Sequence, residues 1–375
     1  YRSDLNRKQS FIENLYLFLF CIINYKYFYY WILRNFYWKK YLKGELSEIF
    51  NKNKINDYIN EVMSKYQFKI KKIEYQEHHT THAYSAYYHS PFAYKEQSLV
   101  FTLDEHGDGY HSKLFLFEPN KTTLLGESQI VKFWINGKVN VTSIAGMYSN
   151  FTEAMDLVRS SEEGKVEAIA AYGKPDNELL GQLFQMVSIR NFAYEINFDI
   201  FKKLSDIEYL RSIRTKIGDE NFCATIQFWL EEVSVDYLNK AHEKFKVNNL
   251  CLAGGAVANV IMNYKIWERT PFKNLFIVPP MGDEGAAAGA AIMTAINAGE
   301  NLEWLKDQYM PYYGPSFNKS DVMQSINKFN KLKFEDLKNN WEEYAAKSVA
   351  NNKVIGIFHG KMEFGPRALG NRSII

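Results

Sequence analysis

The clearest hydrophobic pattern in the chain is a pair of apolar runs on either side of a polar, glycine-rich segment. Residues 98–120, SLVFTLDEHGDGYHSKLFLFEPN, carry β-branched and aromatic residues before and after a Gly/Asp-rich turn. This pattern is typical of two strands joined by a tight turn. Two later segments, 248–268 and 274–299, each start with a short apolar run, pass through glycines and continue with helical periodicity. Each predicts a buried strand, a loop and a helix.

Helical patterns dominate the rest of the chain. A helical stretch is predicted from SIAGMYSNFTEAMDLV through GKVEAIAAYGKPD, with Gly173 and Pro175 as its stop. Residues 176–247 are predicted to be mostly amphipathic helix. The segment MPYYGPSFNKSD has the turn residues of a linker, and a helix–strand unit is predicted over 341–359. We therefore expect a first domain over 1–310, a linker over 311–340 and the start of another domain over 341–375.

The segment 11–38 is strongly apolar and aromatic, and its pattern bears on membrane insertion. Polar residues divide it, so it has no clean run of about 20 uncharged residues. They are Glu13, Asn14, Asn24, Lys26, Arg34 and Asn35. A buried or interfacial amphipathic helix pair is predicted instead of a membrane span, and its aromatic surface could serve a homodimer. Because the chain opens at Tyr1 and stops inside a motif, we expect it to be part of a longer protein.

Composition limits the class of protein and its partners. A chain of 375 residues exceeds the size of about 250–300 at which one core stops growing, so two lobes are expected. The net charge of +2, with dispersed basic residues, does not indicate a nucleic-acid partner. The three cysteines Cys21, Cys223 and Cys251 are scattered and lack C-x-x-C spacing, which favours a reducing compartment. We expect a cytoplasmic protein.

Three histidines cluster in EHHTTHAYSAYYHSPF, residues 77–92. On a helix, His78 and His82 project from one face, while His79 points roughly 100° away. That spacing suits two imidazoles on one metal ion, although such pairs also occur by chance on solvated helices. A zinc-protease H-E-x-x-H motif is excluded, because the intervening residues contain no glutamate.

Two carboxylates also stand at element ends. Asp104 follows the apolar run LVFTL and could hold a metal or face a phosphate. A polar hairpin turn explains Asp108 well but Asp104 less well, and His106 and His111 are interpreted as hairpin surface. Asp283 precedes an Ala/Gly-rich helix, where it could serve as an N-cap. The run of small residues after it indicates close packing against a neighbour or a ligand.

Two further segments could contact phosphates or nucleotides. Gly254 and Gly255 follow a predicted buried strand, where glycines let an adenine or ribose lie against the backbone. Asn259 follows them on the next helix and could contact the nucleotide or merely cap. At the C-terminus, GKMEFGPRALGNRSII places Glu363, Arg367 and Arg372 among Gly, Pro and Ala. Guanidinium groups on such a bent backbone suit phosphate recognition, with a structural ion-pair cluster as the alternative.

Five of these segments together resemble the NodU/CmcH family of O-carbamoyltransferases, from about residue 74 to the C-terminus. They are EHHTTHAYSAYYHSPF, TLDEHGDG, GKVEAIAAYG, CLAGGAVAN with MGDEGAAAGAA, and GKMEFGPRALGNRSII. The resemblance implies an α/β protein with the two-lobed actin-like ATPase (ASKHA) fold, similar to the tRNA threonylcarbamoyl-transfer protein, followed by a YrdC-like domain. It further implies that ATP and carbamoyl phosphate form carbamoyl-adenylate in the YrdC-like domain. The actin-like part would then pass the carbamoyl group to a hydroxyl of a small-molecule or glycan acceptor.

The resemblance also implies roles for individual residues. His78, His82, Asp104 and Asp283 would bind Fe(II), or Mn or Zn in its place, with His79 as a neighbour. The adenylate would contact Gly254, Gly255, Asn259, Gly285 and, as a weaker candidate, Lys165. Glu363, Arg367 and Arg372 would open the YrdC-like half of the carbamoyl-adenylate site.

The chain also departs from the family pattern. Glu167 and Ala168 replace the usual Met-Gly, GGAVAN stands where GGVALN is commoner, and the DASA-like phosphate loop does not precede the matching region. Two alternative functions are a tRNA threonylcarbamoyl-transfer-like enzyme and a non-catalytic actin-like scaffold.

Overall fold

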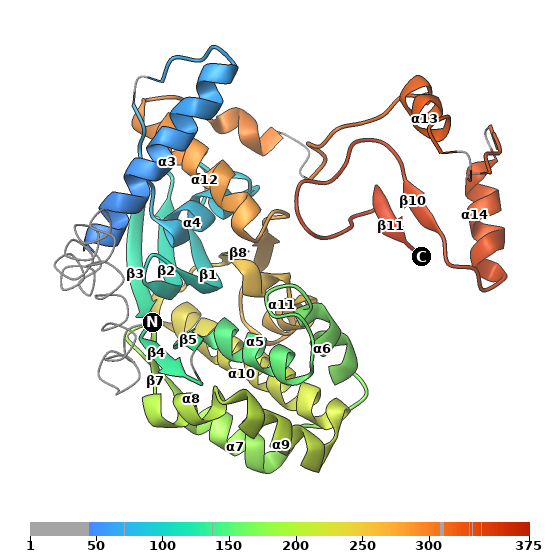
Figure 1. Cartoon of the computed structure of the whole chain (residues 1–375). Helices are drawn as coiled ribbons and strands as arrows, with labels where there is room; N and C mark the ends of the chain where they lie inside the picture. Colours follow the sequence, from blue (N-terminus) through green and yellow to red (C-terminus); the bar gives the residue numbers. More distant parts are fainter. Residues whose placement is uncertain are drawn as a thin grey trace, which may run out of the picture. The chain divides into compact units, whose positions relative to one another are not determined.

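The computed structural model covers most of the chain beyond the N-terminal region (Figure 1). The described residues are 45–70, 72–136, 138–307, 311–329, 331, 333–338 and 340–375. The apolar segment 11–38 lies outside them, so its predicted amphipathic helix pair stays a prediction. Within the described ranges, every helix is too short or too polar to span a membrane.

The chain divides into two compact units. The first comprises residues 1–75 and 132–140. Among its described residues it contains α3 (Glu45–Lys65) and β4 (Lys132–Ile135), which pairs with β5 (Lys138–Val141). The second comprises residues 76–131 and 141–375, and it holds every residue that the sequence analysis singled out for a site.

A mixed five-stranded sheet forms the centre of the second unit. Its strands run in the order β3-β2-β1-β8-β9. Their bounds are β1 (Ser98–Gly107), β2 (Tyr110–Glu118), β3 (Lys121–Gln129), β8 (Asn249–Ala253) and β9 (Asn274–Ile277). The first three are antiparallel, as the predicted strand–turn–strand requires, whereas β8 and β9 run parallel to β1. Both predicted strand–loop–helix units are present, so the α/β class is confirmed.

Helices cover both faces of this sheet. Successive side chains of a strand point to opposite faces, so each strand can contact the helices on both sides. The ring of Phe117 in β2 packs on Tyr87 of α4 (His78–Tyr88), with centroids 4.6 Å apart. On the other face, the ring of Phe101 in β1 packs 4.7 Å from Tyr237 of α10 (Asp219–Phe245). The helix α12 (Asp283–Asn297) lies alongside α4 (Figure 1). Aromatic packing thus anchors α4 to the sheet, and α12 packs against α4.

The stretch 143–173 is two helices and not one continuous run. α5 (Ile144–Ala154) and α6 (Glu163–Ala170) are separated by a loop in which Asp156 and Ser160 have left-handed backbone conformations, with φ of 61° and 59°. A left-handed residue cannot continue a right-handed helix. The loop brings residues of both helices to one pocket, described below.

The prediction that residues 176–247 are mostly helix is confirmed, with one interruption at residues 187–196. These form the hairpin of β6 (Val187–Arg190) and β7 (Ala193–Ile196), joined by Asn191 and Phe192 with positive φ. Its strands have four residues each, too few for alternation to stand out in the sequence. The helices around it are α7 (Asn177–Met186), α8 (Phe198–Leu204) and α9 (Ile207–Ile217).

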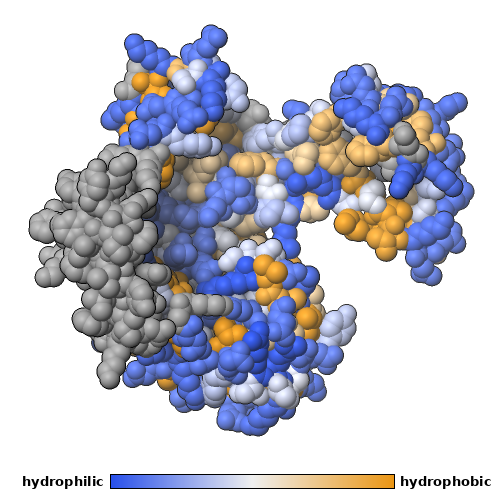
Figure 2. Space-filling model, viewed as in Figure 1, coloured by the Kyte–Doolittle hydropathy of each residue, from blue (hydrophilic) through white to orange (hydrophobic). Residues whose placement is uncertain are grey.

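Short elements complete the second unit. They are η2 (Gly255–Ala258), α11 (Val260–Arg269), η3 (Glu303–Asp307), α13 (Lys319–Ile326), α14 (Trp341–Ala350), β10 (Gly356–Phe358) and β11 (Arg372–Ile374). The predicted helix–strand unit at 341–359 corresponds to α14 and β10, and the predicted linker contains α13. The division at 310 and 340 stays a prediction. Figure 2 shows a largely hydrophilic face on which apolar residues form separate patches, several of them over this C-terminal segment.

Candidate metal centre and adjoining pocket

Helix α4 holds His78 and His82 in a defined position. The carboxylate of Glu77 caps the helix by accepting hydrogen bonds from the backbone N–H and the hydroxyl of Thr80. One helical turn separates the two imidazoles, and their Nε2 atoms lie 3.2 Å apart. The His82 side chain is fully buried, whereas that of His78 is 20% exposed. The predicted helix and its histidine face are therefore present.

Asp104 reaches this pair through an irregularity in β1. Leu103 pairs with Ser112 and Gly107 with Tyr110, so Asp104–His106 lie opposite a single residue of β2. Such a bulge re-aims side chains at a strand end. The backbone N–H of Gly255 donates to Asp104 Oδ2 at 3.0 Å, which ties the carboxylate to the loop after β8.

Asp283 approaches from the start of α12. The N-cap of that helix is Gly282, so the alternative that Asp283 itself is the cap was wrong. Its carboxylate is 80% exposed and places Oδ1 3.6 Å from Nε2 of both His78 and His82. A side chain inside the first turn can point away from the helix end, and here it points to the histidines.

The four side chains converge, and the nearest distances between their ligand atoms are at or slightly above those around one metal ion. Nε2 of His82 lies 3.3 Å and Nε2 of His78 3.6 Å from Asp104 Oδ2, and all four ligand atoms lie within 4.8 Å of one another. Ligands about 2.1 Å from a shared ion lie roughly 3.0–3.4 Å apart at octahedral or tetrahedral angles. Two imidazoles and two carboxylates suit Fe(II), Mn(II) or Zn(II). The donor set therefore fits such an ion.

The electrostatic interactions within the cluster also favour a metal-binding site. Burial disfavours a charge on His82, but the hydrogen bonds that its imidazole donates to Asp104 and Asp283 outweigh burial and raise the pKa of His82 to about 9. Burial also opposes the charge on Asp104, yet the imidazoles and the Gly255 amide hold the pKa of that carboxyl well below its usual range. Without a metal, the cluster therefore keeps a proton that a divalent cation would displace.

The other nearby histidines lie outside the cluster. The ring of His79 contacts the Thr102 hydroxyl through Nδ1 at 2.9 Å and the Tyr110 carbonyl through Nε2 at 3.2 Å, and burial lowers its pKa to about 4. The interpretation of His111 as hairpin surface was wrong. It is fully buried opposite the bulge and stacks on Tyr194. His106 is exposed, as interpreted.

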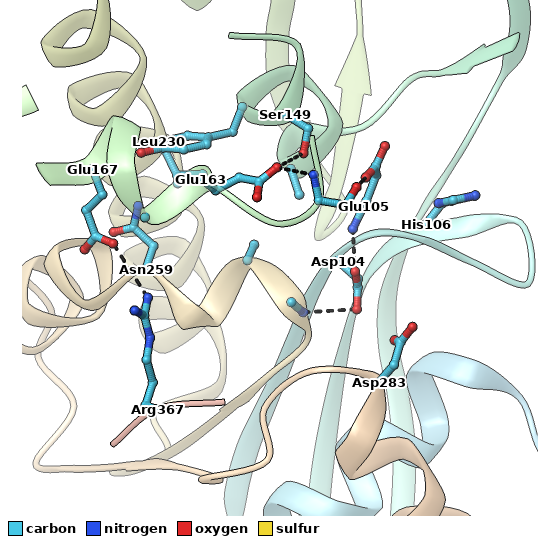
Figure 3. A pocket seen from close by; sticks show the side chains of 16 residues that line it. Asp104, Glu105, His106, Ser149, Glu163, Glu167, Leu230, Asn259, Asp283 and Arg367 are labelled. Atoms are coloured by element: carbon cyan, nitrogen blue, oxygen red, sulfur yellow. Dashed lines mark hydrogen bonds and ion pairs between the residues drawn. The ribbon is translucent and has the colours of Figure 1, made fainter. Parts of the chain in front are cut away.

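A pocket of about 430 Å³ adjoins the cluster (Figure 3). Its lining combines residues of β1, α5, α6, α10, η2 and α12, and of the loops next to them, with the segment after β10. They are Asp104, Glu105, His106, Ala145, Tyr148, Ser149, Ser160, Glu163, Gly164, Glu167, Leu230, Gly255, Ala256, Asn259, Asp283 and Arg367. In Figure 3, Asp104 and Asp283 lie at one end, while Glu167, Asn259 and Arg367 lie at the other. A ligand in the pocket would therefore reach the cluster.

Sequence reasoning missed the polar groups that line this pocket between its ends. Glu105 receives two hydrogen bonds from the Arg159 guanidinium and one from the Ser160 hydroxyl. Glu163 accepts from the Ser149 hydroxyl at 3.0 Å and from the backbone N–H of Ser160. Glu105 stands beside Asp104 in the sequence, a signal that could have identified it. Arg159 lies 54 positions away, so its role had no local signal.

Of the predicted adenylate residues, Gly255 and Asn259 line the pocket. Asn259 also caps α11 and exchanges hydrogen bonds with the side chain of Gln227. Gly254 and Gly285 serve close backbone packing instead. A Cβ on Gly254, whose φ is +99°, would lie 2.2 Å from the Leu103 carbonyl oxygen, and one on Gly285 would lie 1.9 Å from that of Pro280.

Lys165 is not among the pocket-lining residues. Its side chain is 60% exposed and its ammonium group pairs with Glu162. This geometry is that of a solvated helix surface.

The C-terminal candidates separate into two groups. The buried carboxylate of Glu363 accepts backbone N–H groups of Leu369, Asn371 and Arg372, together with the Arg372 guanidinium at 2.8 Å. Burial opposes its charge, but these donors lower its pKa to about 2. Glu363 and Arg372 thus form the structural ion-pair cluster. Arg367 instead lines the pocket and contacts the Ala258 carbonyl.

The chain belongs to the carbamoyltransferase family. The family model described as Carbamoyltransferase N-terminus matches residues 21–292, and Carbamoyltransferase C-terminus matches residues 346–375. The resemblance drawn from the sequence motifs is therefore confirmed.

Two curated relatives match about four-fifths of the chain. An uncharacterized protein of Methanocaldococcus jannaschii, MJ1058, is 48% identical over 81% of this chain and 51% of its own length. Nodulation protein NolO of Bradyrhizobium diazoefficiens is 30% identical over 80% of this chain and 52% of its own length. The chain thus spans about half the length of these curated relatives.

Two solved structures also align with parts of the chain. Full-length HypF in the phosphate- and nucleotide-bound form aligns with a TM-score of 0.39 and 14% identity, over 63% of this chain and 37% of HypF. HypF from T. kodakarensis aligns with a TM-score of 0.34 and 13% identity, over 61% and 38%.

Proposed function

We propose that this chain is part of an enzyme that transfers a carbamoyl group to a hydroxyl of a small-molecule or glycan acceptor. The co-substrates would be ATP and carbamoyl phosphate, with carbamoyl-adenylate as the donor. The observation that carries the proposal is the convergence of His78, His82, Asp104 and Asp283 at one end of a pocket of about 430 Å³. A pocket of this volume is large enough for a ligand the size of a nucleotide.

The proposed architecture is an actin-like carbamoyl-transfer domain followed by the start of a YrdC-like domain. Membership of the carbamoyltransferase family, with matches to both its N- and C-terminal models, supports this assignment. The loop between β8 and α11 adds a physical reason, because backbone N–H groups at such a junction can bind anionic groups. The adenylate would lie along this loop.

The four cluster residues would hold the metal ion. A bound Fe(II), Mn(II) or Zn(II) ion would supply Lewis-acid chemistry by polarising a carbonyl or phosphoryl oxygen. Asp104 is held in place from two sides, by the backbone N–H groups of Glu105 at 2.6 Å and Gly255 at 3.0 Å. Such fixed outer contacts keep a ligand oriented and maintain its affinity for the ion.

The pocket walls would orient the donor and the acceptor. The Arg159 guanidinium balances the negative charge of Glu105. The Glu105 carboxylate therefore stabilises the pocket wall and does not repel an anionic donor. In the described part of the chain, both hydrogen bonds to Glu163 reach Oε1. Its second oxygen can then accept a hydrogen bond from the acceptor hydroxyl. Asn259, fixed by Gln227, would contact the nucleotide at the opposite end.

The two alternative functions have less support. The match of residues 346–375 to the Carbamoyltransferase C-terminus model favours O-carbamoyl transfer over a tRNA threonylcarbamoyl-transfer-like enzyme. A non-catalytic scaffold would have no need for four metal-type donors at ligand spacing.

The test is carbamoyl transfer by the purified protein that contains this chain. It would be loaded with Fe(II) or Mn(II) and given ATP, carbamoyl phosphate and a panel of aminoglycoside, cephem and oligosaccharide acceptors. We expect pyrophosphate release and, for one acceptor class, a product whose mass has grown by one carbamoyl group. A protein that loads metal but neither consumes ATP nor modifies any acceptor would contradict the proposal.

A further inference from the structure

The β1–β2 hairpin turn contacts His78 in two ways besides carrying Asp104. Asp108 and Gly109 form the turn with φ of 48° and 91°, and Gly107 pairs with Tyr110 across it. Two consecutive positive φ values define the tight turn that matches strand twist, and Asp-Gly is a favoured pair for it. The sequence pattern around Asp108 indicates only a turn residue. Its side chain, however, reaches helix α4.

The first contact is a hydrogen bond to the backbone. Asp108 Oδ2 accepts the backbone N–H of His78 at 2.8 Å. His78 is the first residue of α4, and the first N–H groups of a helix have no partner within the helix. Glu77 satisfies the N–H of Thr80, so two carboxylates hold the first turn of the helix. A negative charge at this end is also favoured by the helix dipole.

The second contact is steric and explains why residue 107 is a glycine. A Cβ on Gly107 would lie 2.0 Å from Cδ2, 2.2 Å from Cγ and 2.7 Å from Nε2 of His78. Atoms do not approach so closely, so the imidazole ring or the strand backbone would have to move. The ring of His78 therefore rests directly on the Gly107 backbone. Any larger residue would push Nε2 away from its place in the cluster.

We propose that Gly107 and Asp108 are positioning residues that set the place of His78 relative to Asp104. The inference rests on the metal centre of the proposed function. One hairpin carries Asp104 in its bulge, receives the His78 ring on Gly107 and holds the His78 backbone through Asp108. The residues of one hairpin therefore set the separation of 3.6 Å between His78 Nε2 and Asp104 Oδ2. Partners of this kind typically change metal affinity about 10–100-fold when removed.

The variants are chosen to separate this role from turn stability. Asp108→Gly removes the acceptor without straining a position that has positive φ. Asp108→Asn keeps an oxygen for the His78 N–H and tolerates the same backbone conformation. The matched control is Asn191→Gly, at the same position of the β6–β7 turn, where φ is 49°. For Gly107→Ala the control is Gly181→Ala in α7, where an added Cβ meets nothing within 4 Å.

The measurement is a cobalt(II) titration of the metal-free protein, followed by the absorption bands that report ligand geometry. We expect Asp108→Gly and Gly107→Ala to bind cobalt about tenfold or more weakly, with altered bands. Asp108→Asn should stay within about threefold of the wild type, because it retains the hydrogen bond. Both control variants should bind like the wild type, and thermal unfolding of each metal-free variant checks its fold.

A cobalt affinity and absorption bands equal to those of the wild type in Asp108→Gly would overturn the proposal. This result decides the question even if Gly107→Ala does not fold. A wild-type protein that binds no cobalt would remove the metal centre and the positioning role with it. A protein that binds cobalt as expected but transfers no carbamoyl group would remove the proposed function and leave this inference intact.

Discussion

A Cβ atom on Gly289 of α12 would lie 1.8 Å from the backbone carbonyl oxygen of Thr81 in α4. The two helices touch backbone to backbone at Thr81, which directly precedes His82 and follows His78 by three residues. The prediction that the Ala/Gly-rich helix packs closely against a neighbour is confirmed, and the neighbour is the helix that carries two of the four cluster residues. Close contact here lets Asp283, at the start of α12, reach both histidines.

Substituting Gly289 by alanine should therefore disturb both stability and metal binding. The added methyl group has to separate the helices, and overpacking of this kind costs about 1–3 kcal/mol. Movement of α12 also carries Asp283 away from the histidines, so cobalt affinity should fall. Urea unfolding and a cobalt titration measure the two effects. Ala287→Ser on the exposed side of α12 is the control, and equal results for both variants would show that the contact is unimportant.

Replacing His82 by alanine should abolish metal content and carbamoyl transfer together. His82 is the fully buried member of the cluster and lies near both carboxylates, so a solvent-exposed side chain cannot take its place as a ligand. The loss of metal affinity should exceed the ~10–100-fold that outer contacts produce. Elemental analysis and the transfer assay measure the two losses. His242→Gln, remote from the cluster, is the control. Transfer at the wild-type rate by H82A would rule out a catalytic metal.

Metal affinity should rise with pH between about 6.5 and 9. The pKa of His82 is raised to about 9 in the metal-free fold, so a metal ion has to displace its proton over this range. Affinity should then increase by about tenfold per pH unit until the pKa is reached. Cobalt titrations in weakly coordinating buffers measure this, and an affinity that does not change from pH 6.5 to 9 would contradict it.

The stability of the metal-free protein should follow the opposite trend. A folded pKa above the unfolded value of about 6.5 means that His82 stabilises the fold fully below pH 6.5 and loses that contribution as pH rises through 9. Asp104 has a lowered pKa, so its contribution is present above about pH 4 and is lost in acid. Thermal unfolding of metal-free wild type and H82A across this range should show the alkaline loss in the wild type alone.

Replacing Glu363 by glutamine should loosen the C-terminal loop without affecting metal binding. The carboxylate accepts three backbone N–H groups and the Arg372 guanidinium, and an amide would turn a donor toward some of them. Hydrogen exchange at Leu369 and Asn371 should accelerate by about tenfold or more. Because its pKa is lowered to about 2, the wild-type loop should keep its protection above pH 4.5 and lose it toward pH 2. Unchanged exchange in E363Q would instead leave Glu363 available for a ligand.

Local patterns in the sequence were enough to predict several elements and part of the site. The strand–turn–strand at 98–120 and both strand–loop–helix units depend on periodicity between near neighbours, which the fold then preserves. His78 and His82 meet because four residues make about one turn of any helix. The same holds for the turn at Asp108, where Asp-Gly suits positive φ.

The tertiary structure decided how these elements meet, because contacts between residues far apart in the chain leave no periodic pattern in the sequence. The bulge that re-aims Asp104 also buries His111, and both follow from how β1 pairs with β2. Arg159 meets Glu105 only after α5 and α6 are placed, and Glu363 turns inward to its own loop instead of toward a ligand. The residue types of the candidate metal centre could be identified in the sequence, but the distances between them depend on packing between distant elements.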